Sequence, residues 1–424
     1  MSPSEKVGIL HSLVGTMAAS ERPLVDAALL AVEELNAKGG LLGRTLEAVV
    51  ADGRSEPAAF GREARRLTGE EGIRTLFGCW TSSSRKAVRN EVEAAGALLW
   101  YPVQYEGLEE SASVFYTGGT INQQVEPALD WALAELGRTF FLVGSDYVYP
   151  RTANRLARAL VRTHGGSVAG EALVPLGSAD FEDVVRRLRE AGPLVVFSTL
   201  NGDSNVAFYR QLAAAGLSPS GWPVLATSVA ETELAAIGEA ARGHLACWGY
   251  FQSVRSEANR RFLSAWRRRY GHDRPASDPI ATAHTQVHLW AAAVRKAGSF
   301  EPAEVAKAAP GCRLPSPLGE TCIRPNHHVT RSAMVGRVGP GGHVDVVWES
   351  AAPFEPLPWL GIERAGLINE TLIKDALAAW PEVESDARLE RRRSAAALVE
   401  SEGRFRAIFE AAPVGIVECS ASGL

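Results

Sequence analysis

Residues 78–88, GCWTSSSRKAV, join an apolar segment to a helical pattern through a turn with one tryptophan and four consecutive hydroxyl residues. The apolar segment 75–80 predicts a buried strand, and the pattern at 84–95 predicts a helix. Such a turn brings hydroxyl groups and the N–H groups of a helix N-terminus together beside an indole ring. The stretch therefore predicts an α/β unit with a polar, ligand-sized site at the end of the strand.

The same strand and helix pattern recurs along the chain. Apolar segments that predict strands lie at residues 7–12, 46–53, 97–103, 139–146, 167–175, 194–200, 223–229 and 244–251, with helical patterns between them. Strands that alternate with helices predict parallel sheets joined by crossover helices. The fold class is therefore α/β.

The pattern restarts after about residue 125, which predicts two lobes. We expect residues 1–125 to form the first part of lobe I, 126–252 to form lobe II, and 253–358 to return to lobe I. Short alternating runs around the turn Gly339-Pro340-Gly341-Gly342 predict an antiparallel hairpin. We expect this hairpin to complete lobe I.

Composition and charge restrict the possible functions. The 424 residues, 46% of them hydrophobic, suffice for two or more domains. The formal net charge is -5, with acidic and basic residues interspersed, so we expect no nucleic-acid partner. No segment approaches the ~20 apolar residues that span a bilayer, so we expect no membrane span.

Two observations bear on location. Residues 1–12 lack the basic and apolar regions of a secretory signal. The five cysteines have neither close pairing nor metal-type spacing, which fits free thiols in a reducing compartment. We therefore expect a cytoplasmic protein.

Three further predicted strands end in aromatic and hydrogen-bonding groups. These groups are Trp100, Tyr101, Gln104 and Tyr105; Asp146, Tyr147 and Tyr149; and Asn201, Asp203 and Ser204. Together with residues 78–88 they predict a cleft with aromatic walls and a few polar anchors. The alternative for residues 78–88 is structural: Ser83 or Ser84 caps the helix and Trp80 belongs to the core.

Six segments carry a family resemblance. They are VGILHSLVGTMAAS (7–20), GCWTSSSRKAV (78–88), LLWYPVQYEG (98–107), GSDYVYPRTAN (144–154), TLNGDSNVAF (199–208) and RPNHH (324–328). Over residues 6–358 the chain resembles the urea and short-chain amide group of type I periplasmic-binding-protein folds. That group includes substrate-binding proteins of urea transporters and a cytoplasmic amide-sensing regulator. The resemblance implies two α/β lobes, with parallel sheets flanked by helices and three crossovers, that close over a ligand.

The resemblance also implies a set of ligand-binding residues: Trp80, Thr81, Ser82, Tyr101, Val103, Gln104, Tyr147, Asp203 and Ser228. An amide carbonyl can accept from the Ser82 hydroxyl, its NH2 groups can donate to Asp203, and its flat face can stack on Trp80 or Tyr101. Gln104 and Ser228 can instead support these groups. This chain has Ala281 and His284 where urea-type proteins tend to have Glu and Tyr, so urea, a short amide and an amino-acid-like molecule remain open.

Enzyme and metal chemistry find little support in the sequence. His284 and His288 stand at i and i+4 on a predicted helix, a spacing compatible with a metal, but Thr285 replaces the glutamate of the zinc-protease motif. Ser82 to Ser84 are not part of a Gly-x-Ser-x-Gly turn. We therefore expect no catalytic residue, no metal site and no cofactor.

The C-terminal residues point to signalling. Residues 359–403 predict a helical linker that ends in a charged helix or short coiled coil, the alternative being a solvated, frayed helix. Residues 400–423 resemble the opening of a PAS domain, and we expect 404–424 to be its truncated start. The sequence thus predicts a cytoplasmic sensor of urea or a short amide, with downstream signalling domains in the same chain and a possible homodimer. The alternatives are the substrate-binding component of a urea or amide ABC transporter and a small-amide hydrolase.

Overall fold

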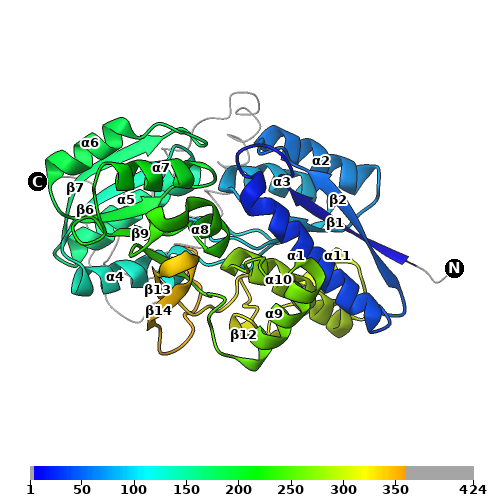
Figure 1. Cartoon of the computed structure of the whole chain (residues 1–424). Coiled ribbons are helices and arrows are strands. Elements are labelled where there is room, and N and C mark those ends of the chain that lie inside the picture. The colour runs from blue at the N-terminus through cyan, green and yellow to red at the C-terminus, as the bar shows by residue number, and fades with distance from the viewer. Residues whose placement is uncertain (1–3, 360–424) are drawn as a thin grey trace, which may run out of the picture. The chain divides into compact units, whose positions relative to one another are not determined.

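A computed structural model describes residues 4–359, in which strands and helices alternate along most of the chain (Figure 1). The predicted linker and PAS segment lie outside these residues. The strands form two larger sheets and a two-stranded ribbon of β11 (Arg313–Ser316) and β12 (Gly319–Cys322). The predicted α/β class and the arrangement in two sheets are confirmed.

The first sheet consists of five parallel strands in the order β2-β1-β3-β4-β5. They are β1 (Ser4–His11), β2 (Thr45–Asp52), β3 (Thr75–Gly78), β4 (Leu98–Tyr101) and β5 (Val114–Tyr116). Helices accompany this sheet: α1 (Ala18–Ala37), α2 (Pro57–Gly69), α3 (Ser82–Ala95), α9 (Glu257–Tyr270), α10 (Asp278–Ala297) and α11 (Pro302–Ala308).

Both faces of the first sheet are buried. Along β1, Ile9 packs in one apolar cluster with Trp290 of α10, whereas Leu10 packs in a second cluster with Leu67 of α2. Adjacent strand residues point to opposite faces, so each face requires its own helical layer. This explains the continuous apolar runs in the sequence.

The second sheet has seven strands in the order β14-β13-β10-β9-β8-β6-β7. They are β6 (Thr139–Ser145), β7 (Ser167–Val174), β8 (Val195–Thr199), β9 (Val224–Ala226), β10 (Leu245–Trp248), β13 (Met334–Val338) and β14 (Val344–Glu349). The accompanying helices are α4 (Val125–Glu135), α5 (Val148–Thr163), α6 (Glu182–Ala191), α7 (Ser204–Ala214) and α8 (Glu231–Ile237). Single 3-10 turns occur at η1 (Ile121–Gln123), η2 (Gly238–Ala241) and η3 (Pro340–Gly342).

The C-terminal hairpin of β13 and β14 belongs to this second sheet and not, as the sequence led us to expect, to lobe I. β13 pairs antiparallel with β10, with Leu245 opposite Arg337. β10 is the last of the parallel strands, and its outer N–H and C=O groups need partners, which β13 supplies. Local patterning predicts a hairpin but says nothing about which open sheet edge it joins.

Three connections link the two sheets, at residues 117–124, 249–256 and 323–333. Arg331 in the third connection donates to the carbonyl oxygen of Thr117 in the first, at 2.8 Å, and to the hydroxyl of Thr282 on α10, at 3.0 Å. It also forms a buried ion pair with Asp278 at the start of α10. One guanidinium group therefore ties two of the connections to α10.

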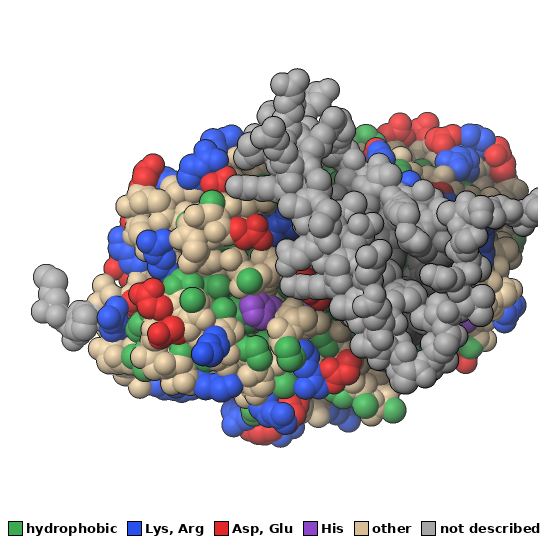
Figure 2. Space-filling model, turned by 180° about the vertical axis from the view of Figure 1, so that it is seen from behind, with side chains coloured by type: hydrophobic (Ala, Val, Ile, Leu, Met, Phe, Trp, Pro, Cys, Tyr) green, Lys and Arg blue, Asp and Glu red, His purple; other side chains and the backbone are tan. Residues whose placement is uncertain are grey.

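The surface mixes charges of both signs. On the face drawn in Figure 2, Lys and Arg side chains are interspersed with Asp and Glu. Within residues 4–359, no helix combines the length and the apolarity needed to cross a bilayer. Cys79, Cys247, Cys312 and Cys322 are buried free thiols.

Candidate ligand-binding site

Loops at the carboxyl ends of strands from the two sheets meet through hydrogen bonds between their side chains. Trp80, after β3, donates from its indole Nε1 to Oδ1 of Asn201, after β8, at 3.1 Å. Gln104, after β4, donates from Nε2 to the hydroxyl of Ser228 at 2.9 Å and to the carbonyl of Thr227 at 3.0 Å, both after β9. These contacts define the candidate site.

Backbone strain at Cys79 helps to position Trp80. Cys79 follows β3 directly, is fully buried and has a φ of 68°, a left-handed conformation that side chains other than glycine rarely adopt. Its neighbour Gly78 lies so close to β1 that a Cβ atom would be 2.0 Å from the carbonyl oxygen of Leu10. Strain of this kind is retained where the surrounding structure enforces it, which is common at binding sites.

The two hydroxyl residues Thr81 and Ser82 have different surroundings. Thr81 is the N-cap of α3, and its side chain accepts a hydrogen bond of 3.1 Å from the backbone N–H of Ser84. This is the structural role weighed as the alternative for residues 78–88, although the capping residue is Thr81 and not a serine. Ser82 donates to Glu106 and accepts from Arg85 Nη1 at 3.1 Å, so its hydroxyl is already engaged.

Tyr101 supports the turn that carries Trp80. Its hydroxyl donates to the carbonyl oxygen of Trp80 at 2.5 Å, and its ring lies under the guanidinium of Arg85, with 4.9 Å between the guanidinium carbon and the ring centre. Burial raises the pKa of Tyr101 well above its usual range, so the phenol is neutral. Tyr101 thus holds the turn at Trp80 in place at the edge of the candidate site.

A buried ion network behind Ser82 is the feature that sequence reasoning missed. Arg85 pairs with Glu106 at 3.1 Å and with Glu109 at 3.0 Å, and Lys86 reaches Glu109 at 2.7 Å. Burial alone would raise the pKa of Glu109, but the neighbouring cations outweigh it and hold that pKa well below its usual range. Basic residues on one turn of the helix at 85–89 and glutamates at 106–110 were the available signal.

Gln104 has unused hydrogen-bonding capacity. Its Oε1 atom is buried and lacks a partner among the described residues. Tyr149 donates to the hydroxyl of Thr227 at 3.1 Å, so it contacts the same residue that Gln104 contacts. The carboxamide of Gln104 is therefore held at one end, by Thr227 and Ser228, and presents a bare acceptor at the other.

The remaining expected residues are spread over different environments. Val103 is buried in the apolar core of the first sheet. Tyr147 is half-buried beside Tyr149, with ring centres 6.5 Å apart, and burial raises its pKa well above the usual range. Asp203 is exposed, because Gly202, with a φ of 61°, turns the chain so that Asn201 and not Asp203 is brought to Trp80.

One group of side chains within residues 4–359 has the composition and spacing of metal ligands. It consists of Glu34, His284 and His288, which belong to α1 and α10 and not to the loops of the candidate site.

Comparisons with known proteins agree with this architecture. A family model described as "Periplasmic binding protein domain" matches residues 5–365. The Leu/Ile/Val-binding protein homolog 6 of Brucella melitensis is 26% identical over 302 residues, which are 69% of this chain and 77% of that protein.

Solved structures show the same fold. A leucine-binding protein from Thermotoga maritima superposes with a TM-score of 0.74 at 20% identity, covering 81% of this chain and 98% of that one. A solute-binding protein of an ABC transporter from R. palustris, in complex with 4-hydroxybenzoate, superposes with a TM-score of 0.75 at 23% identity, covering 85% of this chain and all of that one (100%).

The expected cytoplasmic location is wrong. The family is that of periplasmic binding proteins, which conflicts with a cytoplasmic protein. The cysteine argument failed because the four described thiols are buried in the fold, and burial leaves them unpaired irrespective of the compartment. The family is also one of binding proteins, in agreement with the expectation that this region is not an enzyme.

The match over residues 5–365, together with the two-sheet fold and the hydrogen-bonded strand ends, assigns the chain to the periplasmic binding protein family, and its candidate ligand site lies between the loops of the two sheets.

Proposed function

We propose that this chain is the solute-binding component of an ABC-type transporter and that it binds a small neutral amide, such as urea or a short-chain amide. The observation that carries the proposal is the carboxamide of Gln104. Its Oε1 is a buried acceptor without a partner in the described part of the chain, and its Nε2 is fixed by Ser228 and Thr227. A ligand NH2 group is a suitable donor to such an oxygen.

The charge of the site favours a neutral ligand. The side chains that link the two sheets there, Trp80, Gln104, Asn201 and Ser228, are all uncharged. Arg85 and Glu106, which lie next to Ser82, are paired with each other. An α-amino acid would bring a carboxylate and an ammonium group, each of which needs an opposite charge or several hydrogen bonds when buried.

Binding would proceed by closure of the two lobes around the connections. The pairs Trp80–Asn201 and Gln104–Ser228 join loops from both sheets, so a ligand at these loops interacts with both lobes at once. A ligand that contacts both lobes stabilises the closed arrangement by its differential affinity for that state.

A branched-chain amino acid is the second candidate ligand. It is favoured by the similarity of this chain to the Brucella relative, a Leu/Ile/Val-binding protein homolog. The chemistry that separates it from an amide is the pair of charges it would have to bury.

A role in sensing is the second candidate function. It is supported by the resemblance of residues 400–423 to the opening of a PAS domain. Spin labels at positions 390 and 400 should change their separation or mobility on saturation with ligand if binding is transmitted to this segment, and an unchanged spectrum would argue against transmission.

Calorimetric titration of the purified protein with urea, acetamide and leucine tests the ligand class. For a ligand of four heavy atoms, about -1.5 kcal/mol per atom gives roughly -6 kcal/mol and a Kd on the order of tens of micromolar. Saturable binding of urea or acetamide with leucine silent supports the proposal. Binding of leucine alone replaces it with the second candidate.

A further inference from the structure

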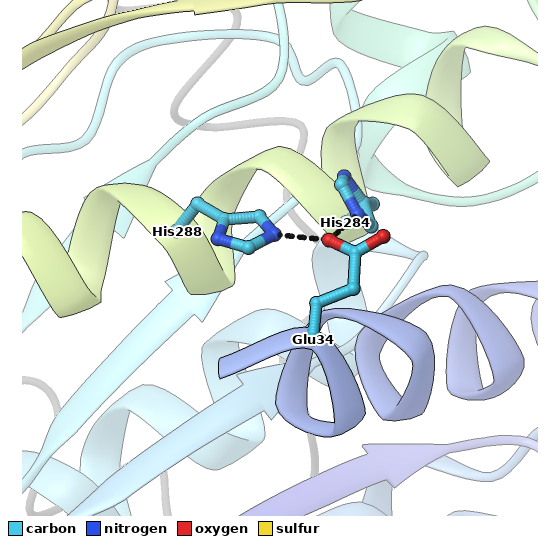
Figure 3. Close-up of side chains that lie close together, drawn as sticks. All are labelled: Glu34, His284 and His288. Carbon is cyan, nitrogen blue, oxygen red and sulfur yellow. Dashed lines mark hydrogen bonds and ion pairs between the residues drawn. The ribbon is translucent and has the colours of Figure 1, made fainter. Parts of the chain in front are cut away.

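Three side chains from two helices converge on one point outside the candidate ligand-binding site (Figure 3). Nε2 of His284 and Nε2 of His288, both on α10, each lie 3.0 Å from the same carboxylate oxygen, Oε2 of Glu34 on α1. The three potential ligand atoms all lie within 4.8 Å of one another. The group is formed only when α1 and α10 pack together.

The helices hold this group in place. His284 and His288 are one turn apart, so both project from one face of α10. The side chains of Glu34, His284 and His288 are 29%, 10% and 19% exposed, so their mobility is restricted while one side remains accessible. Ser20, near the start of α1, contacts Glu233 of α8, a helix that accompanies the second sheet. Glu34 lies 14 positions after Ser20, which is about 21 Å along α1.

From this geometry we infer that Glu34, His284 and His288 form a binding site for one divalent transition-metal ion of the zinc class. Two imidazole nitrogens and one carboxylate are a donor set that Zn2+ uses in proteins, with the fourth position left open. Bonds of about 2.0–2.1 Å in a tetrahedral site place ligand atoms roughly 3.3 Å apart, close to the two N–O separations of 3.0 Å found here.

The surroundings select the kind of metal and leave room for its fourth ligand. A cavity of about 870 Å3 lies against the three side chains and is also lined by Lys38, Arg268 and Arg295. A hard cation such as Mg2+ or Ca2+ depends on several oxygen ligands and on their negative charge, neither of which this basic cavity offers. A borderline ion held by imidazole bonds tolerates such surroundings. The basic side chains would favour an anion or a hydroxide at the open position.

The alternative is a hydrogen-bonded cluster in which one carboxylate oxygen accepts from both histidines. Nδ1 of His284 is buried and has no partner among the described residues, and this holds for either arrangement, because both use Nε2. The cluster explains the two distances but gives no reason for two histidines to share a single oxygen.

Equilibrium dialysis of untagged, chelator-stripped protein against Zn2+ decides between the two. We expect one zinc ion per chain, with no uptake of Mg2+ under the same conditions. His288→Gln and Glu34→Gln each remove one ligand while keeping a side chain of similar size that can hydrogen bond. Loss of an outer partner costs about 10–100-fold in affinity, so loss of a ligand itself should cost at least about 100-fold. The matched control is His272→Gln, at an exposed histidine, which should bind zinc as the wild type does.

Two further measurements exclude indirect effects. Thermal unfolding without metal shows whether each variant folds, and Co2+ should give the visible absorption bands of a tetrahedral site in the wild type and lose them in His288→Gln. The affinity for urea or acetamide at the candidate ligand-binding site should not change in either variant. A result that refutes the metal site is therefore distinguishable from one that refutes the proposed function. Absence of stoichiometric zinc, or equal zinc binding by the wild type and both variants, would mean that the three residues form only a hydrogen-bonded cluster.

Discussion

The indole Nε1 of Trp80 donates a hydrogen bond of 3.1 Å to Oδ1 of Asn201, and this bond joins a loop of the first sheet to a loop of the second. Both side chains are almost completely buried. The two residues are 121 positions apart in the sequence, so only the approach of the lobes creates the contact.

Removal of this donor should loosen the closed arrangement in the absence of ligand. Trp80→Phe keeps an aromatic ring but deletes the indole N–H, which leaves Asn201 Oδ1 without this donor, at a cost of about 1–3 kcal/mol. We expect a larger radius of gyration by small-angle X-ray scattering without ligand and a wild-type value with saturating ligand. Trp222→Phe is the control, because Trp222 donates to Leu188 within the second lobe. Equal radii for Trp80→Phe and wild type would show that the bond does not contribute to closure.

Gln104→Leu tests the carboxamide that carries the proposed function. It removes the bare acceptor Oε1 and the bonds to Thr227 and Ser228. We expect at least about tenfold weaker binding of urea or acetamide by calorimetry, the usual cost of one buried hydrogen bond. Gln211→Leu, where the amide bonds backbone groups of Ala179 and Phe181, serves as the control for folding. Unaltered affinity in Gln104→Leu would remove Gln104 from the site.

Asp203→Asn distinguishes the exposed position of Asp203 in the structure from the ligand-binding role that the family resemblance implies. Because Asp203 is exposed, we expect the affinity for urea or acetamide to stay within about twofold of wild type, a difference of roughly 0.4 kcal/mol. A loss of more than tenfold would mean that Asp203 turns toward the ligand on binding, as the resemblance implies.

Arg85→Met should destabilise the protein severely. The substitution leaves Glu106 and Glu109 as buried carboxylates without their main partner, and breaking a buried pair in this way costs about 3–5 kcal/mol. Unfolding in guanidinium chloride, followed by circular dichroism, measures the loss. Arg186→Met, which breaks an exposed pair with Glu190, should show no measurable change. A similarly small effect at Arg85 would show that Lys86 and Arg89 neutralise the carboxylates on their own.

Glu231 should make stability depend on pH. Burial raises the pKa of Glu231 to about 8 from an ordinary 4.5. Between these values the folded protein keeps a proton that the unfolded chain releases, so this group lowers the free energy of unfolding as pH rises from 4.5 to 8.

Glu231→Gln keeps an acceptor for the backbone N–H of Gln252 and removes the titration. The difference in free energy of unfolding between variant and wild type should therefore grow across that pH window, by on the order of a few kcal/mol. Denaturant titrations at several pH values measure it. A difference that does not vary with pH would show that Glu231 is ionised in the folded protein.

Much of the fold could be predicted because the strands and helices follow from local patterns of apolar residues. The period of the apolar residues predicts strands such as 75–80 and helices such as 84–95. The alternation of strands and helices in turn predicts parallel sheets. The position of Trp80 at a strand end was also local information, since the carboxyl ends of parallel strands gather at one edge.

What tertiary structure alone decided are contacts between residues remote in sequence. The hairpin joined β10 because that edge was open, the turn at Gly202 brought Asn201 and not Asp203 to Trp80, and Arg85 found its carboxylates 21 and 24 residues away. His284 and His288 were visible as an i, i+4 pair, but Glu34, 250 residues from His284, completes the group only through the packing of α1 on α10. The sequence by itself determined which elements form, because periodicity is local, whereas the partners of each polar group depend on which surfaces those elements bury against one another.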